Sequence, residues 1–294
     1  MTLTLFDLTY KVAVALGSVI EGKATGGSAT TIIDTVERLE ADNYWIRGTA
    51  WILRDSGGVG GAPEREYSVI VSNTLSTNTI TLRETLTAVV AAGDKYALGK
   101  RRYPLAILIQ KINAGLVAMG TIPLTDIVTI PALASSQSEY SLPIRAGMDL
   151  RRVFYALRSN AADHDYQEVF DWDVQESPTG TADKLILPGP YYSTGNPVKL
   201  EYMDIHPSLN LVTDQLNDGV HPDRVVLEAV KECLHWRRTK VGGGDPTLDS
   251  LMVKTEQSLQ TVKEDHPIDA PPVAPKLLII KRANRRYPGD RRPR

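Results

Sequence analysis

The run GGVGG at positions 57–61 is the first stretch whose residue types and spacing could do chemistry. Glycine-rich turns cradle phosphate groups where a strand leads into a helix and a Lys-Ser or Lys-Thr pair follows. Here strand-like sequence lies on both sides of the run, and no such pair follows it. The run therefore predicts the tip of a β-hairpin.

Two acidic stretches contain residues that could bind a metal ion or hydrolyse a sugar. Asp163, His164 and Asp165 are consecutive, so on an extended chain their side chains alternate between two faces and do not converge on one ion. Asp171 and Asp173 fall on one face of a predicted strand, but alternation with apolar neighbours is typical of any solvent-facing side. We predict no metal site and no bound cofactor.

The remaining polar candidates are scattered along the chain. His206 and His221 each precede a proline and are expected in turns, whereas Pro222 and Asp223 are typical of the first turn of a helix. The single cysteine, Cys233, excludes an intramolecular disulfide, and its helical surroundings predict a buried, unreactive thiol. No serine lies in a nucleophile-elbow context. We predict no catalytic residues and a protein that is not an enzyme.

The strongest chemical feature is the basic sequence at the C-terminal end. From Lys276 onward there are eight Lys or Arg and one Asp, a formal charge of +7; the whole chain has −2, so the rest has −9. Prolines before this stretch forbid a regular helix, and KLLII at 276–280 is a β-prone segment without a predicted neighbour. Such a segment favours addition to the sheet edge of another subunit. The predicted partner-binding residues are Leu277, Leu278, Ile279, Ile280, Lys281, Arg282, Arg285, Arg286, Tyr287, Arg291, Arg292 and Arg294.

Three interpretations of this basic end stay open. It is a solvated terminus, a segment that contacts the phosphates of nucleic acid, or a segment that inserts into an acidic protein pocket. The apolar residues of KLLII favour a protein partner, because phosphate binding alone would not need them.

Length and composition limit the number of domains and the class of protein. The chain has 294 residues, of which 42% are hydrophobic and 23% charged, enough for one large domain or two ordinary ones. No apolar run approaches the roughly 18 residues of a membrane span, and the first residues lack a basic leader. We therefore expect synthesis in the cytoplasm and no membrane partner.

Hydrophobic periodicity predicts helices over 3–20, 103–119, 222–240 and 247–264. Strand and turn signals fill 28–98 and 126–202, a pattern that favours an antiparallel sheet or small sandwich. The predicted fold class is α+β, with a helical bundle core, β-rich segments and an extended C-terminal arm. The expected divisions are an N-terminal helix 1–20, a β-rich module 21–100, a core helix 101–120, a second β-rich domain 121–207, a helical hairpin 208–265 and the arm 266–294.

Several segments resemble a family of structural proteins from tailed bacteriophages. The small-residue loop ATGGSATTIIDT leads into DNYWIRGTAWILRD, then into a glycine-rich hairpin, SVIVSNTLSTNTITL and AAGDKYAL. After this module come the helix PLAILIQKINAGLVAMG and the segments YSLPIRAGMDLRRVFYAL, KLILPGP and VKLEYMDIHPSLNL. The order of these segments is similar to that of head–tail adaptor, or connector, proteins.

The resemblance implies a virion protein of the neck, between capsid and tail. Proteins of that family form a homo-oligomeric ring, usually a dodecamer, beneath the portal, and their C-terminal arms dock on the portal. The implied partners are the portal protein, other neck or tail proteins and, transiently, the genomic DNA that passes through the channel during ejection. An acidic body would suit the wall of such a channel because it repels DNA.

Two other functions stay open. A DNA-contacting neck or tail protein would use the basic end and would lose affinity steeply with salt. A carbohydrate-binding or hydrolytic tail component would use aromatic residues of the second β-rich domain, such as Trp172, Tyr191 and Tyr192, to stack on sugars.

Overall fold

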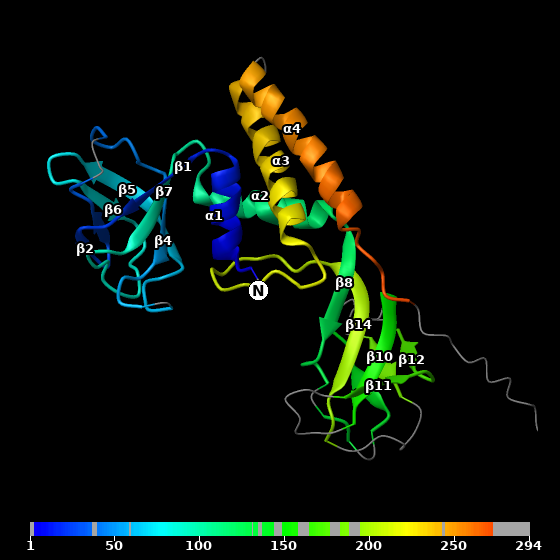
Figure 1. The fold of residues 1–294 in the computed structure, drawn as a ribbon. Coiled ribbons are helices and arrows are strands. Elements are labelled where there is room, and N and C mark those ends of the chain that lie inside the picture. The colour runs from blue at the N-terminus through cyan, green and yellow to red at the C-terminus, as the bar shows by residue number, and fades with distance from the viewer. Residues whose placement is uncertain are drawn as a thin grey trace, which may run out of the picture. The chain divides into compact units, whose positions relative to one another are not determined.

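The computed structural model describes residues 3–36, 40–58, 60–130, 132–134, 137–143, 149–157, 165–176, 183–187, 195–242 and 245–272. The chain divides into two compact units. The first consists of Met1–Leu124 and Asp204–Asp269, and the second of Thr125–Met203 and Ala270–Arg294. Figure 1 labels the helices and strands and colours the chain from blue at the N-terminus to red towards the C-terminus.

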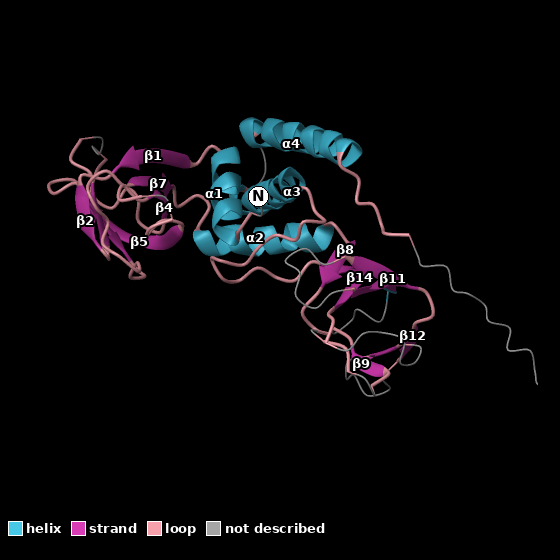
Figure 2. Cartoon of the chain, turned by 60° about the horizontal axis from the view of Figure 1, so that its bottom comes forward, coloured by secondary structure: helices cyan, strands magenta, loops and turns pink. Residues whose placement is uncertain are grey.

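A seven-stranded antiparallel sheet in the first unit has the order β1-β7-β4-β5-β6-β3-β2. Figure 2 shows these strands in magenta. Their bounds are β1 (Val19–Lys23), β2 (Gly26–Ser28), β3 (Thr31–Ile33), β4 (Thr49–Arg54), β5 (Glu66–Thr74), β6 (Thr79–Leu82) and β7 (Lys95–Gly99). The glycine-rich run 57–61 lies between the paired strands β4 and β5, as the sequence predicts.

Alternation along β4 divides its side chains between two environments. Ala50 and Ile52 belong to a hydrophobic cluster that also includes Trp45. Trp51 points to the opposite face, where its indole N–H donates a hydrogen bond of 3.1 Å to the hydroxyl of Thr9 in helix α1 (Leu5–Ala15). Both side chains are fully buried, so this bond joins the first helix to the sheet.

Local sequence signals explain where the helices begin and end. Thr4 and Asp7 form a capping box at the start of α1. Pro222 occupies the first turn of α3 (Pro222–Val241), and Asp245 caps α4 (Pro246–Asp265). The helix predicted over 3–20 is shorter in the structure, because Gly17 has a φ of 62° and the chain continues as strand β1.

The helices pack against one another in the first unit (Figures 1 and 2). Helix α2 (Leu105–Ala118) packs against α3, and α3 packs against α4. A Cβ atom at Gly115 of α2 would lie 3.1 Å from the backbone nitrogen of Ala229 in α3. Glycine therefore permits the close approach of these two helices. None of the helices in the described ranges is long and apolar enough to cross a bilayer.

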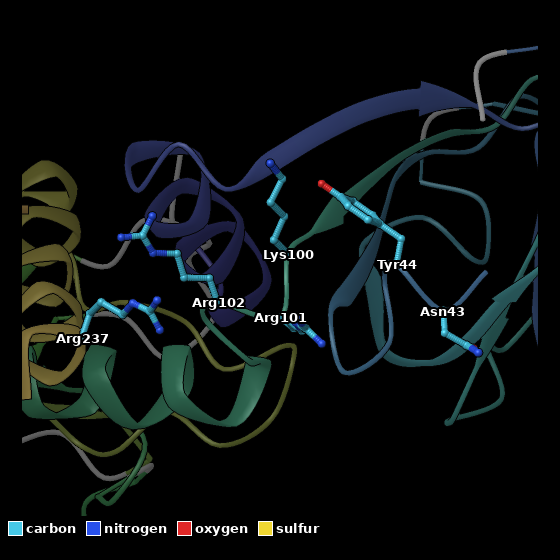
Figure 3. A pocket seen from close by; sticks show the side chains of 6 residues that line it. All are labelled: Asn43, Tyr44, Lys100, Arg101, Arg102 and Arg237. Atoms are coloured by element: carbon cyan, nitrogen blue, oxygen red, sulfur yellow. The ribbon is translucent and has the colours of Figure 1, made fainter. Parts of the chain in front are cut away.

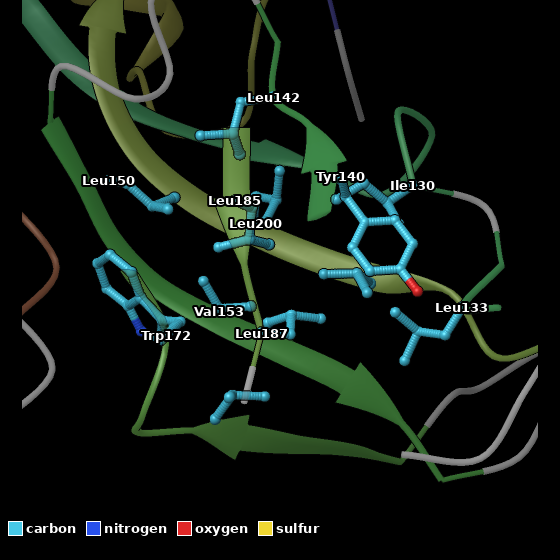
Figure 4. Close-up of a cluster of buried hydrophobic side chains, with 12 residues drawn as sticks. Ile130, Leu133, Tyr140, Leu142, Leu150, Val153, Trp172, Leu185, Leu187 and Leu200 are labelled. Carbon is cyan, nitrogen blue, oxygen red and sulfur yellow. The ribbon is translucent and has the colours of Figure 1, made fainter. Parts of the chain in front are cut away.

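The second unit contains most of the remaining strands around its own core; the first of these strands begins in the first unit, at Thr121, and the last ends there, at Ile205. A four-stranded sheet has the order β11-β10-β14-β8, and a three-stranded sheet has the order β12-β13-β9. Their bounds are β8 (Thr121–Asp126), β9 (Glu139–Ser141), β10 (Leu150–Ala156), β11 (Tyr166–Val169), β12 (Asp173–Gln175), β13 (Lys184–Ile186) and β14 (Val198–Ile205). Residues of both sheets, among them Val153, Leu185 and Leu200, share one buried cluster (Figure 4). This arrangement agrees with the sandwich-like pattern in the sequence.

The predicted helical bundle core is wrong. The described chain is mostly antiparallel sheet, with fourteen strands in three sheets and four helices. Two hydrophobic clusters are formed mainly by strand residues, and Trp45, Trp51 and Tyr96 are among the largest buried side chains. The helical periodicity predicts the four helices, but it shows only that each helix has an apolar face. It does not show how much of the core the helices supply.

Candidate functional site

A group of positively charged side chains follows strand β7. The backbone N–H of Lys100 donates to the carbonyl of Ser18 at 3.0 Å, which fixes the chain directly after the strand. Tyr103 then turns inward and is buried, while Lys100, Arg101 and Arg102 remain exposed. Pro104 precedes the first residue of α2. The three cations therefore lie on a short connection between strand β7 and helix α2 (Leu105–Ala118).

The loop before β4 supplies two more side chains. Asn43 has a φ of 60°, and its N–H donates to the carbonyl of Asn73 on β5 at 2.9 Å. The amide oxygen of Asn73 accepts the N–H of Trp45 at 2.8 Å. Tyr44, between these two anchored residues, has 47% of its surface exposed, and its ring meets that of Trp45 edge-on. The loop is thus held by strand β5 and presents Tyr44 to solvent.

Arg237 reaches the same region from helix α3. The neighbouring Trp236 packs with Tyr103, their ring centroids lying 6.4 Å apart. Burial raises the pKa of the Tyr103 hydroxyl, although the nearby positive charge of Arg102 opposes this effect. The Arg102 guanidinium lies 5.8 Å from the centre of the Tyr103 ring. These aromatic contacts fix the last turns of α3 beside the connection that leads into α2.

Together the six residues line a cavity of about 650 Å³, which we call the cationic cavity. Figure 3 shows Arg237 and Arg102 on neighbouring elements, with Lys100, Arg101 and Tyr44 nearby. The lining residues are Asn43, Tyr44, Lys100, Arg101, Arg102 and Arg237. Four of the six are cations and none is acidic.

Other cations on the helices are neutralised by carboxylates. Lys231 pairs with Glu228 at 2.9 Å, and Arg238 approaches Asp249 at 3.5 Å. By contrast, none of the four cations of the cationic cavity forms an ion pair with any carboxylate in the described ranges. The Nε atom of Arg237 is buried, and no described residue accepts a hydrogen bond from it. A concave surface with one sign of charge concentrates its field and attracts ions of the opposite sign. The arrangement can therefore bind an anion.

A second cavity, of about 420 Å³, lies where α3 begins and α4 ends. The imidazole rings of His221 and His266 stack there, with centroids 3.7 Å apart and planes at 3°. Asp218, Asp265 and Asp269 also line it. The described residues nevertheless include no group of three or more His, Cys, Asp or Glu arranged to hold a metal ion.

The partner-binding residues predicted from the sequence, Leu277–Ile280, Lys281, Arg282, Arg285, Arg286, Tyr287, Arg291, Arg292 and Arg294, all lie outside the described residues. Their role stays a prediction. Asp163, His164, Tyr191 and Tyr192 also lie outside them.

The structure places several other candidates in structural roles. Trp172 is 7% exposed and belongs to the core of the second unit, so its ring offers no face to a sugar. His206 is buried: its Nδ1 donates to the carbonyl of Pro207 at 2.6 Å, and its Nε2 accepts the N–H of Asn217 at 3.0 Å. Burial lowers the pKa of this imidazole below its usual value, although the hydrogen bond to Pro207 opposes the effect. Cys233 is buried on α3, as expected.

Sequence reasoning missed the cationic cavity. The signals were the run KRR at 100–102, directly after a predicted strand, and the pair RR at 237–238 within a predicted helix. Each pattern alone is typical of an ordinary solvated surface. Only folding brings Arg237 to the connection between β7 and α2.

No model of a known protein family matches this chain, and no curated protein matches its sequence.

Proposed function

We propose that this chain is a structural protein of a tailed-bacteriophage particle, a head–tail connector that joins the portal to the tail and surrounds part of the DNA path. Its action would be binding and assembly rather than catalysis. The partners would be the portal protein, neighbouring neck or tail proteins and further copies of the chain in a ring.

The observation that supports this proposal is the way the resembling segments fold. ATGGSATTIIDT supplies β2 and β3, and TAWILR supplies β4. The segments up to AAGDKYAL supply β5, β6 and β7 of the same seven-stranded sheet. Helix α2 then follows directly. The first set of resembling segments, from ATGGSATTIIDT to AAGDKYAL, therefore supplies strands of one sheet. YSLPIRAGMDLRRVFYAL and KLILPGP belong to the second unit, as does the start of VKLEYMDIHPSLNL.

Docking on the portal would use residues 276–294. The apolar residues 277–280 would add as a strand to a sheet edge, which satisfies their backbone N–H and C=O groups. The arginines that follow would pair with acidic groups on the portal, which sets the orientation and speeds association.

The test compares the full chain with a chain that lacks residues 276–294. Each protein is mixed with the portal protein encoded in the same genome, and the masses of the complexes are measured by native mass spectrometry. We expect the full chain to form a ring on the portal, and the shortened chain to remain folded but unbound. A matched variant, Arg282→Gln with Arg285→Gln and Arg286→Gln, keeps the apolar segment and isolates the contribution of charge.

Undiminished portal binding by the shortened chain would exclude the docking role of residues 276–294. If the full chain neither binds the portal nor forms a ring with it, the connector function itself is excluded.

A further inference from the structure

We propose that the cationic cavity binds single-stranded nucleic acid through its phosphates, with one base stacked on Tyr44. This inference goes beyond the connector function and does not depend on it, because the cavity lies in the folded body and the proposed docking segment is 276–294. It also differs from DNA contact by the basic C-terminal end, since other residues are involved.

The charge of the cavity indicates an anionic ligand. Lys100, Arg101, Arg102 and Arg237 come from two elements, the β7–α2 connection and helix α3, and line one cavity to which the described residues contribute no carboxylate. Like charges that approach one another oppose folding unless they are solvated or a counter-ion neutralises them. The rest of the chain is acidic, so a cluster of unpaired cations is a specific local feature rather than part of a basic surface.

The arginines favour phosphate as that anion. A guanidinium presents several N–H donors in a fixed plane that matches the oxygens of a phosphate group. In Figure 3 the side chains of Arg102 and Arg237 lie on neighbouring elements beside the cavity, with Arg101 and Lys100 further along the connection. Several cations around one cavity can contact more than one phosphate of a single strand.

Tyr44 distinguishes a nucleic acid from a simple anion. Its side chain lines the cavity and is 47% exposed, while hydrogen bonds of Asn43 and Trp45 to Asn73 hold its loop in place. Exposed aromatic rings beside cationic grooves stack bases of single strands, and each stacked base contributes about 1–3 kcal/mol. The bases of a duplex are already stacked inside it, so an unpaired strand suits this site better. The cavity volume of about 650 Å³ is also within the range of pockets that enclose ligand-sized groups.

The test measures binding of fluorescein-labelled oligothymidylate of about 12 nucleotides, a length within the usual range of single-strand sites. Fluorescence anisotropy is recorded at several salt concentrations for the full chain and for the double variant Lys100→Gln, Arg101→Gln. Both residues are exposed, so the variant should remain folded, which circular dichroism verifies. We expect affinity on the order of tenfold lower at low salt, and a salt slope reduced by about 1.4, because each lost phosphate contact removes about 0.7.

Two controls isolate the cavity. The variant Arg83→Gln, Lys254→Gln removes two exposed cations outside the cavity and should lower affinity much less. All of these proteins contain the same residues 276–294, so binding by the basic end is equal in each. Tyr44→Ala tests stacking: it should weaken oligothymidylate binding several-fold and leave the salt slope unchanged.

Three outcomes would overturn the proposal. Equal losses in the cavity variant and the charge control would show that binding depends only on net charge. An unchanged affinity of the cavity variant would exclude the site. If labelled oligoglutamate of equal charge binds more tightly than oligothymidylate and loses this affinity in the cavity variant, the ligand is an acidic protein segment instead. None of these results depends on portal binding, so the connector function is judged separately.

Discussion

The carboxylate of Glu228 on α3 lies 2.8 Å from the ammonium nitrogen of Lys263 on α4. Glu228 also accepts a hydrogen bond from Lys231, one turn further along its own helix, at 2.9 Å. Its side chain is only 2% exposed, so this charge is buried between the two helices. Burial alone would raise the pKa of the Glu228 carboxyl, but the hydrogen bonds from Lys263 and Lys231 outweigh it and lower the pKa below 4.5.

This arrangement predicts that Glu228→Gln destabilises the protein at neutral pH. The variant leaves two ammonium groups without their shared carboxylate, and hydrogen bonds to charged groups contribute about 1.5–3 kcal/mol. Because the pKa is lower in the folded than in the unfolded state, the stabilisation is complete above about pH 4.5 and is lost as the pH falls through the folded value. The difference between wild type and variant should therefore shrink below pH 4.5.

Urea denaturation at pH 7 and at pH 3.5 measures both effects. Glu256→Gln, which removes an exposed carboxylate on α4, is the matched control and should change the free energy of unfolding by less than about 0.5 kcal/mol. Equal stabilities of Glu228→Gln and Glu256→Gln at pH 7 would show that the three-residue ion cluster adds nothing.

A side chain at position 48 should destabilise the protein for steric reasons alone. A Cβ atom there would lie 2.2 Å from the carbonyl oxygen of Gly99 on β7 and 2.8 Å from that of Trp45. Both are backbone atoms, so relief would require the strand to move. We expect Gly48→Ala to lower the free energy of unfolding by about 2–4 kcal/mol.

Gly26→Ala is the matched control for Gly48→Ala. Gly48 directly precedes β4, whereas Gly26 lies in β2 of the same sheet, where a Cβ would meet nothing within 4 Å. The free energy of unfolding of Gly26→Ala should differ from that of the wild type by less than about 1 kcal/mol in thermal or urea denaturation. If Gly48→Ala is as stable as the wild type, then the backbone before β4 and the end of β7 do not approach each other as closely as the structure shows.

We expect the thiol of Cys233 not to react in the folded protein. The residue is fully buried on α3, and burial raises the pKa of its thiol to about 12. Thiolates, not thiols, attack disulfide reagents, so both access and ionisation oppose the reaction. With Ellman's reagent at pH 8 we expect no absorbance change until denaturant is added. Ser258→Cys, at an exposed position of α4, should add one thiol that reacts at once; a rapid first thiol in the wild type would contradict the prediction.

Much of the secondary structure follows from local sequence. The pattern 103–119 predicted α2 (Leu105–Ala118), and Pro222 and Asp245 mark the starts of α3 and α4. Local signals were less reliable where the backbone takes special angles. The strand-like YWIRGTAWILRD forms a strand only from Thr49, because Asn43 and Arg47 have positive φ angles and hydrogen bonds to β5 hold the preceding loop.

The sequence by itself determined that four helices alternate with strand-rich regions, that Cys233 is buried and that positive charge is concentrated after Lys276, because these depend on periodicity, caps and composition. Only the tertiary structure decided that strand residues form two of the hydrophobic clusters and that Arg237 joins Lys100, Arg101 and Arg102 around one cavity. The reason is physical. Hydrophobic burial and convergence of charge depend on which distant segments pack together, and no short stretch of sequence contains that information.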